Sequence, residues 1–341
     1  MRTILVTGAA GFIGSNFVRM LIARGEDVKI IALDKLSYAG NLSNLKEVLK
    51  DKRLVFVKGD ICDASLINSL WDEHGIREVV NYAAETHVDR SIMSSAPFVQ
   101  TNIVGTQVLL DTAKTKGVDK FLQISTDEVY GTLPEDKPEI KFTEETPLEP
   151  NSPYSASKTA ADCLVRSYFH TFKMPVLTTR CSNNYGPYQF PEKIIPLFIT
   201  NLIEGKQVPL YGDGKNIRDW IHVEDHCEGI WATLNKGKPG EVYNFGGDSE
   251  RTNRQLTEII LQLMKKDWDK SVQYVKDRPG HDRRYAIDAS KAKRELDWSP
   301  KHNFEQGLVE TIEWYRANEK WWRAIKSGEY LKYYEQQYSS R

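Results

Sequence analysis

Apolar runs of strand length alternate along the chain with stretches of helical periodicity. The first run, residues 2–7, leads into a glycine-rich turn, and apolar residues then recur at helical spacing from Phe12 to Leu21. Further apolar runs follow, separated by helical stretches, at 28–33, 54–57, 79–83, 121–124 and 176–180. Strands that alternate with helices predict an α/β fold with a doubly wound parallel sheet and helices on both of its faces.

The pattern becomes irregular after Gly186 and Pro187, where prolines become frequent and turn sequences appear. A chain of 341 residues has room for about two domains, on the scale of roughly 150 residues per domain. We expect a Rossmann-type domain over residues 1–186, to which a segment at about 219–249 returns. Residues 187–341 are expected to form mostly a smaller α/β domain that holds the substrate.

Composition argues against several classes of protein. Lys and Arg number 46 against 47 for Asp and Glu, so a formal net charge of -1 gives no general attraction to nucleic acid or to an anionic membrane. The first apolar stretch is broken by Gly8 and Gly11, which fits neither a signal sequence nor a spanning helix and makes the cytoplasm the expected location. The four cysteines are scattered singly, so we expect reduced thiols.

Aromatic residues gather near the C-terminus. We expect them to pack against their own domain or against a second copy of the chain, because aromatic clusters of this density usually do so. No chemistry is assigned to them. They are Trp314, Tyr315, Trp321, Trp322, Tyr330, Tyr333, Tyr334 and Tyr338.

The first turn carries glycines spaced G-x-x-G-x-x-G, at Gly8, Gly11 and Gly14. Backbone amides at a helix start can approach a pyrophosphate there, and the helix dipole favours its charge. Asp34 follows about twenty residues later at the end of the next apolar run, where a carboxylate can bind the ribose hydroxyls of adenosine and would repel a 2′-phosphate. This strand–turn–helix context, more than the glycines alone, predicts NAD as the cofactor.

Two later segments follow strands that should end at the same edge of the sheet, where ligands bind in open α/β folds. Asp60 and Ile61 suit an adenine contact, and residues 82–87 end the next predicted strand. We expect Thr86 to lie near the substrate. For His87, a packed or solvated loop position is the commoner case for a lone histidine.

A second group of residues joins the strand end at 125–131 to Tyr154 and Lys158. Ser152 and Pro153 have the residue types of an N-cap and a first helical position, which places Tyr154 and Lys158 on one helix face at i and i+4. A phenol with a pKa of about 10 is a poor base at neutral pH. Tyr154 therefore needs the ammonium group and a positive nicotinamide to lower its pKa before it can accept a hydroxyl proton.

Asp127 and Glu128 supply an acid and a base that a plain dehydrogenase does not need. Hydride transfer requires one proton acceptor, whereas loss of water from a sugar requires a second base at carbon and an acid at the departing oxygen. Adjacent carboxylates push their pKa values apart, so one can begin protonated and the other ionised. A capping or solvated pair is the alternative, and the combination with Tyr154 and Lys158 favours a dehydratase.

On these motifs the chain resembles the extended short-chain dehydrogenase/reductase family and, within it, the nucleotide-sugar 4,6-dehydratases. The resemblance covers nearly the whole length and extends to 83–85, 182–187, 191–193, 216–220 and 278–284. Related epimerases lack the Asp-Glu pair after the threonine, and related decarboxylases and mannose dehydratases resemble Thr-Ser-Glu there. The sequence Thr126-Asp127-Glu128 thus favours the glucose-type dehydratases.

The resemblance implies a reaction and a substrate, dTDP-glucose, with NAD as cofactor. Tyr154 takes the proton of the sugar 4-hydroxyl, Thr126 bonds the same oxygen, and the C4 hydride passes to NAD+. Glu128 then removes the C5 proton of the 4-ketone while Asp127 protonates the leaving 6-hydroxyl. Hydride returns to C6 and a proton to C5, which gives a 4-keto-6-deoxy sugar for rhamnose-type deoxysugar biosynthesis and regenerates NAD+.

Motifs and resemblance together predict the residues of the site. The catalytic residues are Thr126, Asp127, Glu128, Tyr154 and Lys158. The cofactor contacts are Gly8, Gly11, Phe12, Ile13, Gly14, Asp34, Lys35, Leu36, Ser37, Asp60, Ile61, Tyr82, Ala83, Ala84, Glu85, Thr86, Thr101, Tyr154, Lys158 and Asn184. The substrate contacts are Thr86, Thr126, Asn183, Glu192, Lys193, Ile194, Pro209, Leu210, Tyr211, Arg218, Asn253, Asp277, Arg278, Pro279, Gly280 and His281, of which Glu192 is expected to assist the elimination.

Other interpretations stay open. A 4-epimerase of the same fold would need Tyr154 but neither Asp127 nor Glu128, and a non-catalytic NAD-binding sensor would usually lack the tyrosine–lysine pair. His222 and His226 have the i,i+4 spacing of zinc ligands, but the glutamate does not follow the first histidine, and no metal is predicted. The resemblance also implies a homodimer joined by helices near 101–117 and 154–172.

Overall fold

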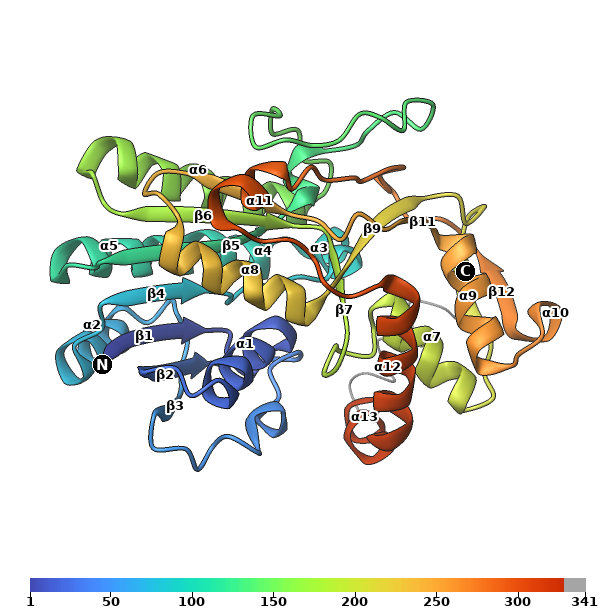
Figure 1. Ribbon diagram of the computed structural model, residues 1–341, viewed down its shortest axis with the longest axis horizontal. Helices are drawn as coiled ribbons and strands as arrows, with labels where there is room; N and C mark the ends of the chain where they lie inside the picture. The colour runs from blue at the N-terminus through green and yellow to red at the C-terminus, as the bar shows by residue number, and fades with distance from the viewer. Residues whose placement is uncertain (328–341) are drawn as a thin grey trace.

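The computed structural model describes residues 1–327 and has a seven-stranded sheet at its centre (Figure 1). The strand order is β10-β6-β5-β4-β1-β2-β3, and each neighbouring pair is parallel. The predicted doubly wound α/β fold is confirmed. The strands are β1 (Arg2–Thr7), β2 (Val28–Asp34), β3 (Leu54–Lys58), β4 (Glu78–Asn81), β5 (Lys120–Thr126), β6 (Val176–Cys181) and β10 (Val242–Phe245).

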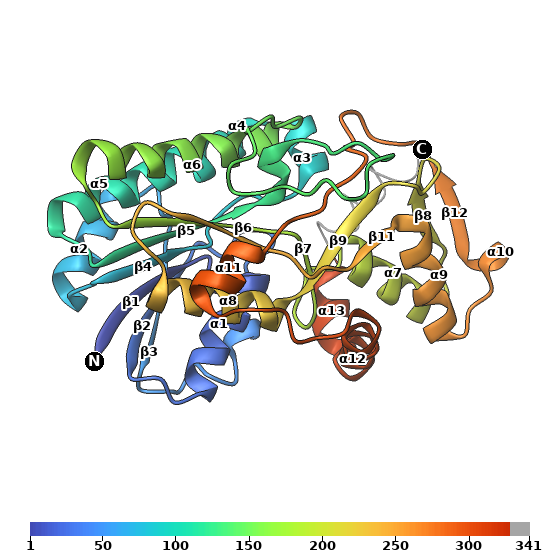
Figure 2. The same cartoon turned by 45° about the horizontal axis from the view of Figure 1, so that its top comes forward.

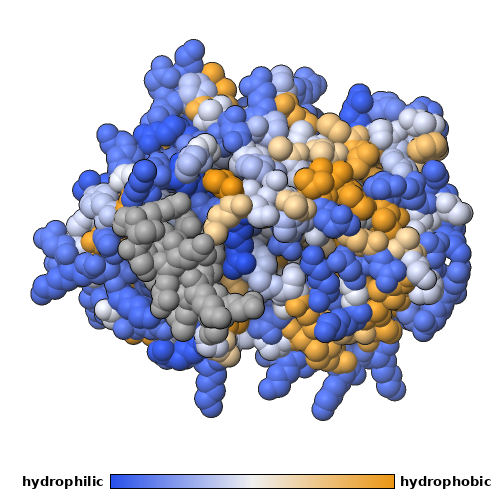
Figure 3. Space-filling view, turned by 180° about the vertical axis from the view of Figure 1, so that it is seen from behind, coloured by the Kyte–Doolittle hydropathy of each residue, from blue (hydrophilic) through white to orange (hydrophobic). Residues whose placement is uncertain are grey.

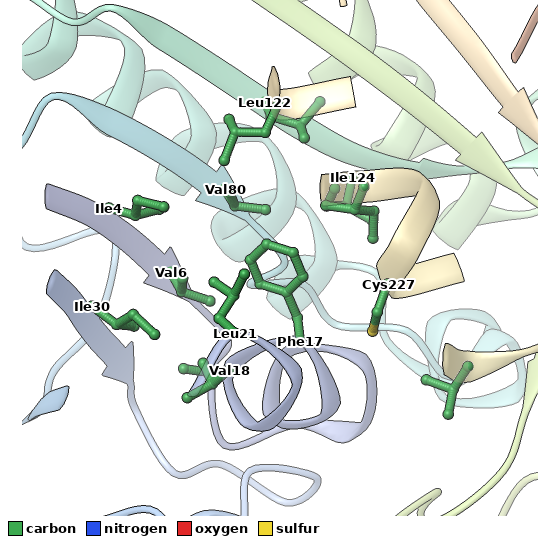
Figure 4. Packing of buried hydrophobic residues seen from close by; sticks show 14 of the residues in the cluster. Ile4, Val6, Phe17, Val18, Leu21, Ile30, Val80, Leu122, Ile124 and Cys227 are labelled. Atoms are coloured by element: carbon green, nitrogen blue, oxygen red, sulfur yellow. The ribbon is translucent and has the colours of Figure 1, made fainter. Parts of the chain in front are cut away.

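Successive side chains of each strand point to opposite faces of the sheet and are buried in two separate helical layers. On one face Ile4 and Val6 pack with Phe17 (Figure 4), and on the other Leu5 packs with Trp71. Burying one such side chain contributes about 1.5–3 kcal/mol, so both layers hold the strand ends in place. The helices are α1 (Phe12–Ala23), α8 (Val223–Lys236) and α11 (Ser290–Leu296) in the first layer, and α2 (Ala64–His74), α5 (Thr106–Lys116) and α6 (Pro153–Phe172) in the second.

A smaller assembly lies beyond the carboxyl ends of the large sheet, and Figures 1 and 2 show it on the side toward which the strands point. It contains one three-stranded sheet, β11-β9-β7, and one two-stranded sheet, β12-β8. Although α8 and β10 follow β9 in the chain, they belong to the large sheet and its helical layer. The elements are β7 (Asn183–Tyr185), α7 (Ile194–Ile203), β8 (Val208–Tyr211), β9 (Ile217–His222), β11 (Glu250–Thr252), α9 (Asn253–Met264), α10 (Trp268–Ser271), β12 (Val272–Val275), α12 (Phe304–Ala317) and α13 (Glu319–Ile325).

The first four aromatic residues of the C-terminal group pack onto this smaller assembly. Tyr315 and Trp322 are fully buried, and Trp314 and Trp321 pack against the same hydrophobic core. The expectation of packing within their own domain is confirmed for these four. The other four residues of the group lie outside the described part of the chain: Tyr330, Tyr333, Tyr334 and Tyr338.

One stretch of helix has a wider winding than its neighbours. Helices α3 (Val88–Met93) and α4 (Ala96–Phe98) lead into a π-helical segment, Val99–Gly105, which continues directly into α5. Buried within it, Asn102 accepts a hydrogen bond from the Glu85 nitrogen at 2.8 Å and donates to the Glu85 carbonyl at 3.1 Å. The π-helix thus anchors the loop that follows β4.

The cysteine side chains are separate from one another. Cys181 and Cys227 are buried, Cys62 is partly buried, Cys163 is exposed, and all four are free thiols. Among residues 1–327, no helix has both the length and the apolar character needed to cross a membrane.

Candidate active site

The turn between β1 and α1 forms a cradle of backbone at the carboxyl edge of the large sheet. Gly8 has a left-handed φ of 62°, and a Cβ added to it would lie 2.8 Å from the Ala83 nitrogen. A Cβ added to Gly14 would lie 2.4 Å from the Gly8 carbonyl oxygen. Helix α1 begins after Gly11 without a side-chain cap, which leaves its first amide groups available to a phosphate.

Asp34 lies at the end of β2, beside this cradle. Its carboxylate accepts hydrogen bonds from the backbone amides of Ala10 at 2.9 Å and Leu36 at 2.7 Å. Burial raises the pKa of Asp34, while these amides and the Lys35 charge lower it. The Lys35 ammonium lies 3.4 Å from the Glu85 carboxylate, so the loops after β2 and β4 are joined at this point.

One groove runs along the carboxyl edge of the sheet from the cradle to α6. Predicted cofactor residues that line it are Gly8, Gly11, Phe12, Ile13, Gly14, Asp34, Lys35, Ser37, Asp60, Ile61, Tyr82, Ala83, Ala84, Thr86, Thr101, Tyr154, Lys158 and Asn184. Leu36 and Glu85 lie beside the groove and do not form its wall. A backbone cradle, an uncapped helix start and a buried carboxylate in one groove fit the pyrophosphate and ribose of NAD.

The same groove continues to the predicted catalytic residues. It is lined there by Thr126, Asp127, Glu128, Asn183, Glu192 and Lys193. Helix α6 begins as predicted, because Ser152 is its N-cap, in a capping box with Ser155, and Pro153 is the first helical residue. Tyr154 and Lys158 are consequently fixed on one face of the first turns of α6.

Tyr154 and Lys158 are both buried. Burial raises the pKa of Tyr154 well above its usual value and the Glu128 charge adds to this, whereas a hydrogen bond with Thr126 lowers it. Burial also lowers the pKa of Lys158, which donates a hydrogen bond of 2.6 Å to the Ile124 carbonyl. The phenol is therefore neutral in the site as it stands.

Asp127 and Glu128 begin a short 3-10 helix, Asp127–Tyr130, that is capped by the Thr126 hydroxyl. Burial raises the pKa of Asp127 well above its usual value, and the charges of Glu128 and Asp219 raise it further. Burial raises the pKa of Glu128 too, but Arg278, Lys193 and Arg218 lower it. Cationic groups thus favour ionisation of Glu128, while Asp127 keeps its proton.

Glu192 lies in a buried cluster at the same end of the groove. Its carboxylate is 3.7 Å from the His87 Nε2 and 3.7 Å from the Arg90 Nε. Burial raises the pKa of Glu192 to about 7, against the lowering effect of Lys193 and Arg90. His87 is a buried histidine that caps α3, and burial holds its pKa well below the usual value. A carboxyl group that titrates near neutral pH therefore faces the sugar end.

The arginines predicted for the substrate come from the smaller assembly. The Arg278 guanidinium lies 3.9 Å from the Asp89 carboxylate, and its Nε is buried with no hydrogen-bond partner among the described residues. Arg218 is buried and donates to the Asp282 carbonyl at 2.8 Å. Two cationic side chains thus approach Glu128 from outside the large sheet.

Other predicted substrate residues surround these arginines and do not line the groove itself. The Tyr211 hydroxyl donates to the Asp89 carboxylate at 3.3 Å, and the His281 ring pairs with Asp277 at 2.6 Å. Leu210 is fully buried within β8. The remaining predicted substrate residues lie in other parts of the smaller assembly. Pro209 is in β8, Ile194 begins α7, Asn253 begins α9, and Pro279 and Gly280 lie in the loop after β12.

Sequence reasoning did not select Tyr285, which the structure places beside the catalytic carboxylates. Its ring lies 4.1 Å from the Arg218 guanidinium, and its hydroxyl donates to the Asp282 carboxylate at 2.5 Å. Burial and the Glu128 charge raise the pKa of Tyr285 well above its usual value. The available signal was its position directly after the segment 278–284, which the resemblance had already singled out.

The histidines that have zinc-ligand spacing take separate roles. His226 is fully buried, and its Nδ1 lies 2.9 Å from the Asn184 Oδ1. His222 instead lies against His302, with ring centroids 4.0 Å apart and 27° between the planes. Together with Glu224 these two rings offer three potential ligand atoms. These three atoms lie within 4.8 Å of one another, whereas His226 is not part of the group, so the predicted i,i+4 pair does not come together as ligands.

Comparison with known proteins gives consistent matches over nearly the whole chain. The family model described as GDP-mannose 4,6 dehydratase matches residues 5–311. A dTDP-glucose 4,6-dehydratase of Xanthomonas campestris is 51% identical, with 97% of each chain covered. The crystal structure of the dTDP-glucose 4,6-dehydratase DesIV from Streptomyces venezuelae with NAD and TYD bound has a TM-score of 0.92 at 50% identity, covering 95% of this chain and 100% of that one. A UDP-glucose 4-epimerase of Thermotoga maritima is similar at a TM-score of 0.85 and 31% identity, covering 93% and 99%.

Proposed function

We propose a reaction for this chain, which belongs to the family of the dTDP-glucose 4,6-dehydratases. The enzyme is a hydro-lyase that uses NAD to convert dTDP-glucose into dTDP-4-keto-6-deoxyglucose, in rhamnose-type deoxysugar biosynthesis. The reaction oxidises C4, eliminates water across C5 and C6, and then returns hydride to C6 and a proton to C5. The observation that carries this proposal is the pairing of the buried Asp127 with the partly buried Glu128 in the groove that also holds Tyr154.

When bound, NAD+ accepts the hydride from C4 and returns it to C6. The amides around Gly11 would hold its pyrophosphate, and Asp34 its adenosine ribose. Asn184, whose amide is fixed by His226, lines the groove near Tyr154 and would lie at the nicotinamide. These residues bind and orient the cofactor.

Tyr154 accepts the proton of the sugar 4-hydroxyl, and Thr126 bonds the same oxygen. Because burial holds the phenol neutral, it can act as a base only when a positive charge lies beside it in the groove. Lys158 is held by the Ile124 carbonyl and contributes one such charge. The surroundings thus link proton transfer at Tyr154 to occupation of the cofactor site.

Asp127 and Glu128 carry out the elimination. Asp127 is held in its protonated form, and its Oδ2 atom has no hydrogen-bond partner among the described residues, so it can donate to the leaving 6-hydroxyl. Burial raises the pKa of Glu128, but the charges of Arg278, Lys193 and Arg218 oppose that rise, so Glu128 is the member of the pair that we assign to removal of the C5 proton. The assignment of acid and base follows from this difference in surroundings.

The nucleotide diphosphate needs cations and hydrogen-bond donors. We assign its recognition to Arg218 and Arg278, whose planar guanidinium groups suit phosphate oxygens. The buried Nε of Arg278 has no hydrogen-bond partner within residues 1–327, and a bound diphosphate would satisfy it. Lys193, which donates to the Thr86 carbonyl at 2.9 Å and lines the groove, adds a third cation near this end.

The test is to incubate the purified protein with dTDP-glucose without added reductant. Formation of a product that has lost one water and shows the alkali-induced absorbance of a 4-keto-6-deoxy sugar supports the proposal. In an Asp127→Asn/Glu128→Gln variant we expect elimination to fall by roughly 10²–10⁴-fold or more, while reduction of bound NAD+ persists. Epimerised sugar without loss of water would instead indicate a 4-epimerase, and no change with any nucleotide sugar would indicate a sensor.

We further propose a homodimer joined through α5 and α6. Figure 3 shows apolar side chains gathered on part of the rear face. Large apolar side chains exposed in this half of the chain include Met93 at the end of α3, Val99 at the start of the π-helix, and Phe172 at the end of α6. Equilibrium sedimentation tests the dimer.

We also propose a cytoplasmic location, which is in keeping with four free thiols.

A further inference from the structure

Segments far apart in the sequence meet beside the cofactor cradle. Residues 186–190, the strap, follow β7, and Figure 1 shows this loop between α1 and α12. Gln189 and Phe190 of the strap line the cofactor groove. On the side of α1, the Asn16 amide donates to the Pro187 carbonyl at 3.0 Å. The strap is thus both a wall of the groove and a contact of the helix that begins the cradle.

Tyr188, at the centre of the strap, is held by aromatic and cationic neighbours. Its φ of 68° is a conformation that bulky L residues rarely adopt. Its ring centroid lies 4.6 Å from that of Trp314 in α12 and 5.9 Å from that of Trp321 in α13, and the Arg19 guanidinium lies 4.7 Å from it. These contacts fix the Tyr188 side chain between α1 and the C-terminal helices and so stabilise its unusual backbone conformation.

Trp321 reaches the cradle by a second route, through Asn44. Its indole N–H donates to the Asn44 Oδ1 at 2.9 Å, across 277 positions of sequence. The buried Asn44 amide then donates to the Ala10 carbonyl at 2.9 Å. Since the Ala10 nitrogen donates to Asp34, Ala10 is held at both its N–H and its carbonyl group, and the Asn41 nitrogen donates to the same carbonyl at 3.0 Å. A displaced Asn44 would remove one of the two hydrogen bonds on the Ala10 carbonyl.

We propose that Trp321 is a positioning residue that slows release of the bound cofactor. It does so by holding Asn44 beneath the glycine turn and Tyr188 in the strap. This inference rests on the proposed function in one respect, because a cofactor that is oxidised and reduced within one cycle must not leave between the two steps. The C-terminal helices α12 and α13 thereby take part in NAD binding. The aromatic residues in this part of the chain acquire a role beyond packing.

The test uses the full-length holoenzyme and measures exchange of its bound cofactor for isotopically labelled NAD, with no sugar present. Trp321→Phe keeps an aromatic ring but removes the N–H group. We expect exchange to become about threefold to tenfold faster, since one net hydrogen bond is worth roughly that factor. Trp298→Phe is the matched control, because it also loses a 2.9 Å indole hydrogen bond, to the Asp225 carbonyl, away from the cradle.

Asn44→Asp provides a second, independent variant. It keeps oxygen atoms that can accept the indole N–H but turns a carboxylate oxygen toward the Ala10 carbonyl. We expect faster exchange than in Trp321→Phe. Because Trp321 acts on the glycine turn through Asn44, the double variant should exchange NAD less fast than the product of the two single effects predicts.

Exchange in Trp321→Phe at the rate of the unmodified protein or of Trp298→Phe overturns the proposal. Should Trp321→Phe fail to fold, the Asn44→Asp result decides, and unchanged exchange there overturns it equally. The assay contains no sugar, so its result does not depend on dTDP-glucose being the substrate. Fast exchange with restored dehydration at saturating NAD supports both inferences, and fast exchange in an enzyme that never dehydrates dTDP-glucose supports this one alone.

Discussion

The two ends of the groove are built in different ways. At the cofactor end, the glycine turn is fixed from both sides before any ligand binds, because Ala10 bonds both Asp34 and Asn44. At the sugar end, some polar atoms have no hydrogen-bond partner in the described part of the chain, among them the Asp127 Oδ2 and the Arg278 Nε. A preformed site favours a ligand that stays, whereas unsatisfied groups gain most from a ligand that enters and leaves in every cycle.

The largest expected effect comes from breaking the cofactor end with Gly14→Ala. The added methyl group would lie 2.4 Å from the Gly8 carbonyl oxygen, so the backbone of the turn must move. Alanine gains about 1 kcal/mol of helix propensity over glycine, which is too little to offset such an overlap. We expect the purified protein to contain less than about a tenth of the normal NAD, by analogy with strongly destabilising overpacking.

Cofactor content is measured by absorbance and by enzymatic assay of the released nucleotide. Gly75→Asn is the control, since Gly75 caps α2 in a left-handed conformation with open space around it, and asparagine tolerates that conformation. Normal NAD content in Gly14→Ala would show that the cradle is less rigid than its contacts indicate.

The sugar end should respond differently, and Arg278→Gln examines it. Loss of the guanidinium should raise KM for dTDP-glucose about tenfold to a hundredfold, the usual range for charge-assisted hydrogen bonds, and leave NAD content unchanged. Steady-state kinetics give the KM. Arg283→Gln is the matched control, because Arg283 pairs with Glu135 and Asp213 at the surface. An equal rise in KM in both variants would contradict the assignment.

The smallest expected effect concerns pH and Glu192. With its pKa raised to about 7 by burial, Glu192 is ionised only above neutral pH. If the carboxylate assists elimination, kcat should fall as pH decreases through about 7, and Glu192→Gln should abolish that limb with about a tenfold lower kcat at pH 8. A kcat–pH profile of each protein tests this. Near-normal turnover in the glutamine variant rules out the role.

The same residue links pH to stability. A carboxyl group whose pKa is higher in the folded protein stabilises the fold fully below its unfolded pKa, and that contribution is lost as pH rises through about 7. Glu192→Gln should therefore raise the melting temperature relative to the unmodified protein at pH 8 more than at pH 5. An equal shift in melting temperature at both pH values would mean that a neighbouring group stabilises the buried charge of Glu192.

How much of the site the sequence could predict follows from the range of the contacts. The glycine turn with Asp34, and Tyr154 with Lys158, are local patterns on one strand–turn–helix unit and one helix face, so their spacing and local context together predicted them. Strand alternation likewise gave the two helical layers. Contacts between distant segments leave no such trace, because neither periodicity nor spacing indicates that Trp321 meets Asn44. Tyr285 likewise comes close to the Asp127–Glu128 pair only because the smaller assembly folds onto the edge of the large sheet.

The π-helical winding of Val99–Gly105 has a consequence for how the length of the chain can change. A π-helix takes up about one residue more per turn than an α-helix, so deleting one residue here would restore regular winding and leave α5 in nearly its present orientation. Leu109 and Leu110, now fully buried, would stay in the core. Asn102 lies within the wider winding and would lose its present place beside Glu85. The loss of one residue in this segment therefore disturbs the cofactor edge while the core keeps its register.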